Sequence, residues 1–469
     1  MAKKVFVVTG LGYGDEGKGT ITHWLCHAHR AHTVVRTGGP QALHRVVTAA
    51  GKEHVFSQFG SGTLCGSATH LSKHMVIDPY AILKEGEAHM YEHGVRGLFD
   101  MLTIHEDALV ITPFQAIVGR LRELLRGAKR HGSVGIGVGE TVLDDDVFGD
   151  TAVRAKDLNA PSLRTKLEAI RLRKLTEFEE IRDRAHVLPP ETRDRIQLEL
   201  RDLEDPDTIQ WAVEQFTKLA CKTRVVGTEY VAKNILESDG TVVFESSQGV
   251  LLDRWYGFHP YTTKVRTIPG TALSIIRECA YGGEINAYGI LRAYHTRHGA
   301  GPFVTESSEI TALLPDASNR DHAWQGNFRV GQFDLVAARY AVDACGSHSL
   351  DGIILTCMDR IRPSATVRFA ERYESVPVEH TQDFFRRSTD TSIERIIVRH
   401  GQGPAQLQRQ EKLGKALETC SPRLTQCTKN IFPEMLADAL NVPIVAISTG
   451  QTEDNKSVVT QIEKRAVSL

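Results

Sequence analysis

A glycine-rich segment near the start of the chain carries the residues best suited to phosphate chemistry. Residues 10–20 read GLGYGDEGKGT, and Gly12 to Lys18 has the G-x4-G-K spacing of a phosphate-binding loop. The glycines let backbone amides converge on an anion, and Lys18 adds a positive charge. Gly19 follows this lysine in place of the usual Ser or Thr. The segment is therefore not an ordinary NTPase loop.

Two carboxylates inside this loop, Asp15 and Glu16, indicate chemistry beyond phosphate binding. A carboxylate repels a phosphate unless a metal ion or a proton transfer requires it. The alternative is a glycine-rich turn with a structural lysine. An apolar strand before the loop, a helix after it and the two acids all favour the functional interpretation.

A second glycine loop follows the next apolar run and ends in a histidine. Residues 36–45 read RTGGPQALHR, with Gly38 and Gly39 in the loop and His44 after them. A lone histidine is more often structural than catalytic. This one lies in a loop after the strand that follows the phosphate loop in sequence, so the residues alone leave both roles open.

The elements that must position these loops are short β-branched strands alternating with helices. This alternation predicts an α/β fold: a single large domain over residues 1–469, with a central, mostly parallel β-sheet flanked by helices. Such sheets bind ligands beyond the carboxyl ends of their strands. The predicted strands are Val5–Thr9, Thr33–Arg36, Leu109–Thr112, Val242–Glu245, Ile285–Tyr294, Ile353–Thr356 and Ile444–Ser448.

A highly charged segment at about 160–220 interrupts this alternation. Residues 163–184 have helical spacing, Pro189 and Pro190 break the pattern, and a second helical stretch follows. We interpret the segment as a helical subdomain of the α/β body. Acidic residues are interleaved with the basic ones, which favours a solvated helix over a nucleic-acid-binding one.

Composition narrows the class of protein. The chain has 469 residues, 41% of them hydrophobic and 24% charged, and a formal net charge of −2, so we expect neither nucleic-acid nor membrane binding. The eight cysteines are scattered and no signal-peptide core is present, which favours a cytoplasmic location. The pairs His23/His27 and His70/His74 have i,i+4 spacing, but nothing completes a zinc site, so we interpret them as structural.

Five motifs, taken together, resemble those of the adenylosuccinate synthetase family. They occur in the family's order over nearly the whole chain. The motifs are GDEGKG (14–19), GG-x4-H (38–44), FESSQG (244–249), TRHGAGPFVTE (296–306) and ISTG (447–450). This resemblance implies a cytoplasmic homodimer that joins L-aspartate to C6 of IMP, a purine nucleoside monophosphate, using GTP and Mg²⁺. In that reaction O6 is first phosphorylated, and the aspartate amine then displaces the phosphate.

The resemblance also assigns roles to individual residues. Asp15 matches the general base at N1, which is also a magnesium ligand, and His44 matches the general acid at O6. Lys18 would neutralise phosphoryl charge, and Gln248 would hold the purine edge. The carbonyl of Leu43 stands at the second protein ligand of magnesium.

The remaining assignments concern the three substrates. GTP is favoured and ATP stays open, because Cys357 stands where the family usually has a lysine. The nucleoside triphosphate residues are Gly14, Glu16, Gly17, Lys18, Gly19, Thr20, Asp359, Ser448 and Gly450. The purine nucleotide residues are Asp15, Ser133, Gln248 and Thr263, and the aspartate residues are Asn327 and Arg329.

Several departures from the family pattern leave the substrate open. GGPQALHR replaces GGHNAGHT, SVGIG (133–137) replaces TTGRG, and Asp150 replaces an arginine that crosses the dimer interface. The aspartate loop keeps one arginine, Arg329. WQGNFRVG (324–331) and SVGIGVGE (133–140) are similar to the branch with phage 2-aminoadenylosuccinate synthetases, which accept dGMP.

Three alternatives follow from these departures. The first alternative is ligation of dGMP or GMP. Retention of Asp15, where the phage enzymes commonly have a smaller residue, favours IMP over these nucleotides. A degenerate nucleotide-binding homologue without turnover is the second alternative, and retention of Lys18, His44 and Gln248 disfavours it. An ordinary GTPase switch is the third, and the absence of an N/T-KxD motif argues against it.

Overall fold

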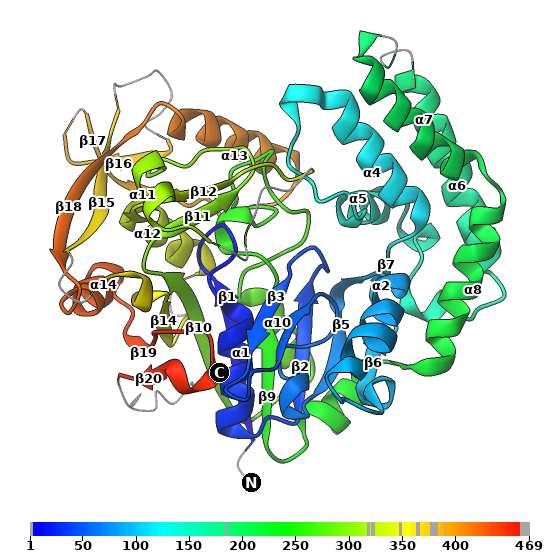
Figure 1. The fold of residues 1–469 in the computed structure, drawn as a ribbon, viewed down its shortest axis with the longest axis horizontal. Helices are drawn as coiled ribbons and strands as arrows, with labels where there is room; N and C mark the ends of the chain where they lie inside the picture. The colour runs from blue at the N-terminus through cyan, green and yellow to red at the C-terminus, as the bar shows by residue number, and fades with distance from the viewer. Residues whose placement is uncertain are drawn as a thin grey trace.

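A large sheet with helices on both faces forms the body of the protein (Figure 1). The computed structural model describes residues 3–459 except for short gaps. The gaps are 183–184, 186, 317–318, 320–323, 347–348, 363–365, 376–382 and 390. No helix in the described ranges is long and apolar enough to cross a bilayer. The predicted α/β class with a central, mostly parallel sheet is confirmed.

Strand β1 (Lys4–Gly10) lies in the middle of the large sheet, between β9 (Thr241–Glu245) and β10 (Glu284–Arg292). The order is β20-β19-β14-β10-β1-β9-β2-β5-β6-β8, and only the β19–β20 pairing is antiparallel. The other strands of this sheet are β2 (Thr33–Gly38), β5 (Ala68–Ile77), β6 (Leu102–His105), β7 (Leu109–Val110, paired with β5), β8 (Arg224–Val226), β14 (Gly352–Thr356), β19 (Ile444–Ser448) and β20 (Lys456–Val458).

Successive side chains of β1 pack into two separate hydrophobic cores, one on each face of the sheet. Val5 and Val7 of β1 pack with residues of α10 (Gly270–Glu278), whereas Phe6 and Val8 pack with residues of α1 (Lys18–His29). Because alternate side chains of a strand point to opposite faces, α1 and α10 must cover opposite faces of the sheet. This two-sided burial explains the continuous apolar runs in the sequence.

The strand register brings the functional loops to one edge. Val8 of β1 and Arg36 of β2 both lie opposite Glu245, the last residue of β9. The loops after these three parallel strands therefore start side by side at the carboxyl edge of the sheet. They hold the phosphate loop, the 38–43 loop and the FESSQG turn.

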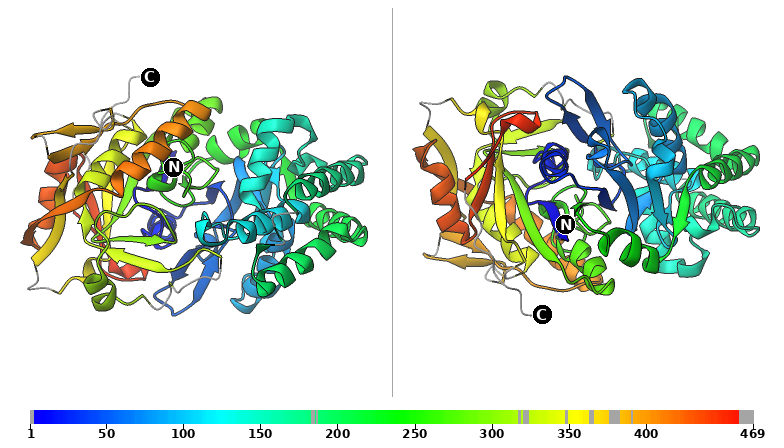
Figure 2. Two further views of the ribbon diagram at one scale, coloured as in Figure 1. Left: turned by 90° about the horizontal axis from the view of Figure 1, so that it is seen from above. Right: turned by 90° about the horizontal axis from the view of Figure 1, so that it is seen from below.

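Helices fill the segment at about 160–220. They are α6 (Leu163–Arg182), α7 (Pro190–Glu204) and α8 (Asp207–Lys222), and they pack around α4 (Pro113–Arg126) at the side of the molecule farthest from the C-terminal strands (Figures 1 and 2). Residues 183 and 184, the end of the predicted first helix, lie outside the described residues.

A second, smaller sheet, which the sequence pattern does not predict, stands on the other side. It contains β13 (Phe333–Asp334), β15 (Thr366–Glu374), β16 (Phe385–Arg387), β17 (Ser392–Ile396) and β18 (Ser421–Thr428). It packs on α12 (Leu335–Cys345) and α14 (Phe432–Leu440). The short ribbons β3 (His44–Val47) with β4 (Glu53–Phe56) and β11 (His295–His298) with β12 (Phe328–Gly331) carry site residues.

Other helices complete the connections, and some local details differ from the expectations. The remaining helices are α2 (Pro79–Lys84), α3 (Met90–Glu92), α5 (Val138–Phe148), α9 (Thr228–Tyr230), α11 (Ser308–Leu313) and α13 (Pro404–Leu417). The predicted strand Leu109–Thr112 is shorter, because Thr112 forms a capping box with Gln115 and starts α4. His70 and His74, which we interpret as structural, both lie in β5.

Candidate active site

The phosphate loop turns sharply between β1 and α1. Gly14 and Gly17 have φ angles of 93° and 87°, and Asp15 itself is left-handed with φ 61°. Lys18 begins α1 and is almost completely buried. Positive φ is costly for Asp15, so the surrounding loop must hold it there. Arg292 helps, because its guanidinium donates a hydrogen bond to the Asp15 carbonyl at 3.1 Å.

Glu16 turns its carboxylate back into the loop. Its Oε1 accepts hydrogen bonds from the amides of Gly12 (3.0 Å) and Gly14 (2.8 Å), and its Oε2 lies 2.6 Å from the Lys18 ammonium. A Cβ added at Gly10, Gly12 or Gly249 would lie 2.2, 2.9 or 2.6 Å from a carboxylate oxygen of Glu16. The bare backbone at these glycines is therefore shaped around the Glu16 carboxylate.

The Asp15 carboxylate points instead toward β11. Its Oδ2 lies 3.2 Å from Nε2 of His298, the last residue of that strand. Burial alone would raise the pKa of Asp15, but the hydrogen bond and charge of His298 hold that pKa below its usual value. Burial lowers the pKa of His298, and its contact with Asp15 outweighs this and raises it. Asp15 is thus kept ionised, as a proton acceptor must be.

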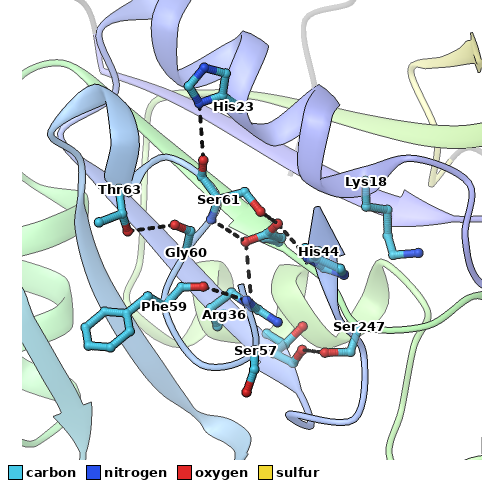
Figure 3. A network of polar contacts seen from close by, with 12 residues as sticks. Lys18, His23, Arg36, His44, Ser57, Phe59, Gly60, Ser61, Thr63 and Ser247 are labelled. Carbon is cyan, nitrogen blue, oxygen red and sulfur yellow. Dashed lines mark hydrogen bonds and ion pairs between the residues drawn. The ribbon is translucent and has the colours of Figure 1, made fainter. Parts of the chain in front are cut away.

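His44 is buried beside a second carboxylate, Glu245. The Nδ1 atom of His44 lies 2.7 Å from Oε1 of Glu245. Figure 3 shows His44, Ser61 and Arg36 converging on one network; the Ser61 amide and hydroxyl donate to Glu245, and the Arg36 Nε lies 3.6 Å from its Oε2. Because Nδ1 faces the carboxylate, Nδ1 carries the proton and Nε2 is left as the free ring atom.

Burial sets the charge of this pair. It lowers the pKa of His44 to about 4, against the opposing effect of Glu245. Burial would raise the pKa of Glu245, but Arg36 and His44 lower it to about 2. The resting pair is therefore a neutral imidazole on an ionised carboxylate. The His44 Nε2 atom is buried and has no hydrogen-bond partner in the described structure.

The side-chain amide of Gln248 is buried without a hydrogen-bond partner in the described structure. Gln248 follows β9, has φ 47°, and both polar atoms of its amide are buried with no hydrogen-bond partner among the described residues. Buried amides are nearly always paired in native proteins. Its left-handed backbone and unpaired amide indicate a ligand-binding role, in agreement with its predicted place at the purine edge.

Ser133 and Thr263 lie near one another at the far end of the 38–43 loop. The Gln41 amide nitrogen lies 3.2 Å from the Thr263 hydroxyl. The Ser133 hydroxyl accepts from the Gly135 amide, and His131, two residues earlier, lies ring to edge with Tyr261 at 6.1 Å. The structure thus brings the two predicted purine-nucleotide residues to one region through three separate loops.

Arg329 and Asn327 lie on or beside β12, next to the His298 strand. Arg329 binds Glu306 at 2.6 Å and the Gly301 carbonyl at 2.9 Å. Asn327 is exposed, and its carbonyl accepts from the amide of Gly299. An aspartate carboxylate binding at Arg329 would compete with Glu306.

Several of the predicted nucleoside triphosphate residues lie where α1 meets the loop after β19. Thr20 donates to the Gln451 carbonyl at 2.6 Å, and the Ser448 hydroxyl donates to the Gly450 carbonyl at 3.1 Å. Lys456 closes this loop by binding the same Gly450 carbonyl at 2.9 Å. Asp359 is exposed in a short turn just after β14, the strand next to β19.

The predicted magnesium ligands have a chemistry that fits the ion. Asp15 has one carboxylate oxygen not engaged by His298, and Leu43 lies in an exposed loop with its carbonyl available. Within the described residues, no cluster of three or more His, Cys, Asp or Glu could hold a metal. Mg²⁺ does not need one, because it usually binds few carboxylates and takes its other ligands from phosphates and water.

Two further site residues, Glu245 and His298, escape the sequence interpretation. Both lie inside the motifs FESSQG and TRHGAGPFVTE. A carboxylate at the end of an apolar strand was a usable signal for Glu245, because an unpaired charge is not tolerated in a core. For His298 no signal was available, since the contact with Asp15 depends on the fold.

Comparisons with known proteins define the class of this protein, a C–N ligase. The adenylosuccinate synthetase family model matches residues 7–457. The chain is 30% identical over 381 residues to adenylosuccinate synthetase of Nitrosomonas europaea, covering 80% of this chain and 81% of the relative. It is 30% identical over 477 residues to that of a Synechococcus species, covering 97% and 93%. The chain belongs to the adenylosuccinate synthetase family.

Two solved structures share the fold. Fully ligated adenylosuccinate synthetase from Plasmodium falciparum aligns with a TM-score of 0.72 and 17% identity, over 97% of this chain and 100% of the other. Cyanophage S-2L succinoaminodeoxyadenylate synthetase, bound to dGMP and dATP, aligns with a TM-score of 0.57 and 15% identity, over 98% and 96%. The predicted family is therefore confirmed, and a phage enzyme is among the proteins of like fold.

Proposed function

We propose that this protein makes adenylosuccinate by joining L-aspartate to C6 of a 6-oxopurine nucleotide, with IMP as the preferred nucleotide. The observation that carries the proposal is the meeting of Asp15, the His44–Glu245 pair and the unpaired Gln248 on loops at one sheet edge. Ser247 ties two of these loops together, since its hydroxyl donates to the Thr37 carbonyl and accepts from the Gly39 amide.

The first step needs a base on one side of the purine and an acid on the other. Asp15 accepts the N1 proton, O6 attacks the γ-phosphoryl group of GTP, and GDP leaves as the bond from its β-phosphate to the γ-phosphorus breaks. The free Nε2 atom of His44 faces the phosphoryl end of O6. An incoming phosphoryl dianion favours an imidazolium there, and Glu245 stabilises it through Nδ1.

The second step begins with Asp15 protonated and His44 as an imidazolium. The aspartate amine attacks C6, the C6–O6 bond breaks, and O6 departs as part of inorganic phosphate. This leaving phosphate accepts a hydrogen bond from His44 and takes up the proton that the amine releases. Gln248 holds the purine edge through its amide, and Arg329 binds a carboxylate of aspartate. Each acid or base typically contributes about 10²- to 10⁴-fold in rate.

The phosphoryl donor and its metal follow the predicted assignments. Asp15 and the Leu43 carbonyl would hold Mg²⁺, which neutralises phosphate charge when bound. Lys18, Thr20, Gly17 and Gly19 would face the phosphates, and Gly14 would line the turn beside them without offering its amide, which Glu16 already engages. Asp359, Ser448 and Gly450 would contact the base. GTP is favoured over ATP because a carboxylate accepts from N1 and N2 of guanine. We expect a cytoplasmic homodimer.

A second candidate, ligation of dGMP or GMP as in phage 2-aminoadenylosuccinate synthetases, rests on the 133–140 and 324–331 segments. Retained Asp15 argues for IMP, since a carboxylate fixed by His298 leaves little room for a 2-amino group beside N1. One clash or misplaced hydrogen bond costs on the order of 1–3 kcal/mol, about 5- to 150-fold.

A product screen tests the proposal. IMP, dIMP, GMP and dGMP are each incubated with L-aspartate, Mg²⁺ and either GTP or ATP, and products are separated by chromatography and mass spectrometry. We expect adenylosuccinate from IMP and GTP with the highest kcat/KM. A higher kcat/KM with dGMP would favour the second candidate, and no aspartate adduct from any pair would indicate a nucleotide-binding homologue without turnover.

A further inference from the structure

Lys264 is a half-buried cation without a counter-ion. It forms no hydrogen bond and no ion pair with the described part of the chain. The basic residues near it, by contrast, form ion pairs. Arg254 pairs with Asp146, and Arg126 pairs with Glu123. Long charged side chains away from the surface are normally paired. Lys264 is therefore placed for a partner that the protein itself does not supply.

The surroundings of Lys264 are those of the predicted purine-nucleotide residues. It follows Thr263, whose hydroxyl meets the amide of Gln41 at 3.2 Å. Its aliphatic stem passes over Gly139 in the first turn of α5, where an added Cβ would lie 3.5 Å from its Cγ. Val265 packs with Val138 and with the 133–137 loop in one small apolar cluster. The lysine thus lies between the Thr263 turn and the Ser133 loop.

The start of α5 adds donors to this place. Gly137 caps the helix with φ 94° and provides no side-chain cap, so the first amides of α5 have no side-chain acceptor at the cap. Free amides at a helix start attract anions. The segment before them, SVGIG, contributes Ser133 and one further glycine, Gly135.

The basic groups around Lys264 also favour binding of an anion. Burial, together with Arg254 and Arg126, lowers the pKa of Lys264. Burial and the charges of Lys264 and other basic groups likewise lower the pKa of His259 to about 4 and that of His131 below its usual value. Glu140 and Asp146 act in the opposite direction on Lys264. A bound phosphate dianion would relieve this repulsion.

We propose that Lys264 binds the 5′-phosphate of the purine nucleoside monophosphate, together with the Thr263 hydroxyl and the first amides of α5, within one subunit. This inference rests on the proposed function, because it takes the purine nucleotide to lie at Thr263 and Ser133. It also accounts for Asp150, whose carboxylate replaces a phosphate-binding arginine of the family pattern. The chain would supply this charge itself and would not borrow it from a second subunit.

Binding measurements on three variants test the inference without requiring turnover. Calorimetry gives the Kd of IMP, dGMP and the nucleoside inosine for the unmutated protein, Lys264→Met, Lys264→Arg and the control Lys233→Met. Lys233 is an exposed lysine in an ion pair with Glu229, far along the chain from the site. Circular dichroism and thermal melting establish that each variant is folded.

We expect Lys264→Met to weaken nucleotide binding at least about 20-fold and inosine binding less than threefold, because only the nucleotides carry the phosphate. Lys264→Arg should stay within about fivefold, and Lys233→Met should bind like the unmutated protein. Equal losses for nucleotide and nucleoside, or an unchanged Kd of nucleotides in Lys264→Met, would overturn the inference. A protein that binds IMP through Lys264 but forms no adenylosuccinate would contradict the proposed function and leave this inference standing.

Discussion

At the scale of single residues, His44 takes its tautomer and charge from Glu245. The 2.7 Å contact fixes a proton on Nδ1 and leaves Nε2 toward the substrate side. Glu245 is itself held by Ser61 and Arg36, so the pair is rigid before any ligand arrives. Such pre-arrangement lowers the reorganisation that a proton transfer requires.

Replacing Glu245 by Gln tests this dependence. An amide at that position cannot stabilise an imidazolium, and it can reverse the tautomer by donating to Nδ1. We expect kcat to fall at least about 100-fold while the Kd of the purine nucleotide changes less than threefold. Steady-state kinetics and calorimetry on Glu245→Gln and His44→Ala measure both quantities. A kcat within threefold of the unmutated enzyme would exclude the pair from the chemistry.

Asp15 supports a second residue-scale prediction. Asp15→Asn keeps the size of the side chain and removes the base and the charge. We expect nearly complete loss of ligation with the fold intact, since Arg292 binds the backbone carbonyl and not the carboxylate. His298→Gln is the matched variant: it keeps a donor toward Asp15, so it should retain more activity than His298→Ala. Turnover of Asp15→Asn close to the unmutated level would remove Asp15 from the role of base.

At the scale of elements, the β11–β12 ribbon connects two parts of the site. His298, at the end of β11, contacts Asp15, and Arg329 of β12 lies opposite Arg297 one position earlier. Phe328 packs on the His298 ring at 4.8 Å. The partner of the proposed base and the proposed aspartate-binding residue are therefore held by one two-stranded element.

Arg329→Ala should act on aspartate and little on the nucleotide. One guanidinium–carboxylate contact is removed, and we expect KM for aspartate to rise about tenfold or more, with KM for the purine nucleotide within about twofold. Arg395→Ala, on β17 in the second sheet, is the control. An unchanged KM for aspartate in Arg329→Ala would place the amine donor elsewhere.

Several strands of the large sheet could be predicted from the sequence, whereas those of the second sheet could not. Strands β1, β2, β9, β14 and β19 are buried on both faces, so their continuous apolar runs identified them. Strand β15 largely alternates exposed and buried residues and carries charges at 368, 371, 372 and 374, which hides it among polar segments. Its partners lie up to about sixty residues away in the chain, so its pairing has no local signal.

At the scale of the whole molecule, long-range contacts decide which charges meet. Asp15 and His298 are far apart in sequence, as are His44 and Glu245, and only the sheet order brings each pair together. The motifs therefore predict Asp15, His44 and Gln248 as site residues, whereas Glu245 and His298, which set the ionisation of His44 and Asp15, needed the structure. The same burial gives the protein an acid-sensitive core.

His70 illustrates this acid sensitivity. It is fully buried in β5, hydrogen-bonded to Thr103 at 2.9 Å, and burial lowers its pKa to about 3. The unfolded chain binds this proton more readily, so the stabilisation is complete above about pH 6.5 and is lost as pH falls toward 3. At pH 5 the loss is on the order of 2 kcal/mol from this residue.

Urea unfolding at pH 7.5, 6 and 5 measures this effect. We expect the free energy of unfolding to fall between pH 6.5 and 5, and His70→Gln to reduce the slope, since glutamine keeps a hydrogen bond to Thr103 and does not titrate. His27→Gln, at an exposed position on α1, is the control and should leave the slope unchanged. Identical slopes for His70→Gln and the unmutated protein would contradict this account.

The carboxylate of Glu16 has a consequence for how the protein meets its nucleotide. Because this side chain already satisfies the amides of Gly12 and Gly14 and the charge of Lys18, the turn needs no bound phosphate to keep its shape. Loop ordering then adds little entropic cost to nucleotide capture. The resident negative charge also directs an incoming triphosphate away from the Gly12 and Gly14 amides, toward the start of α1 and the 38–43 loop.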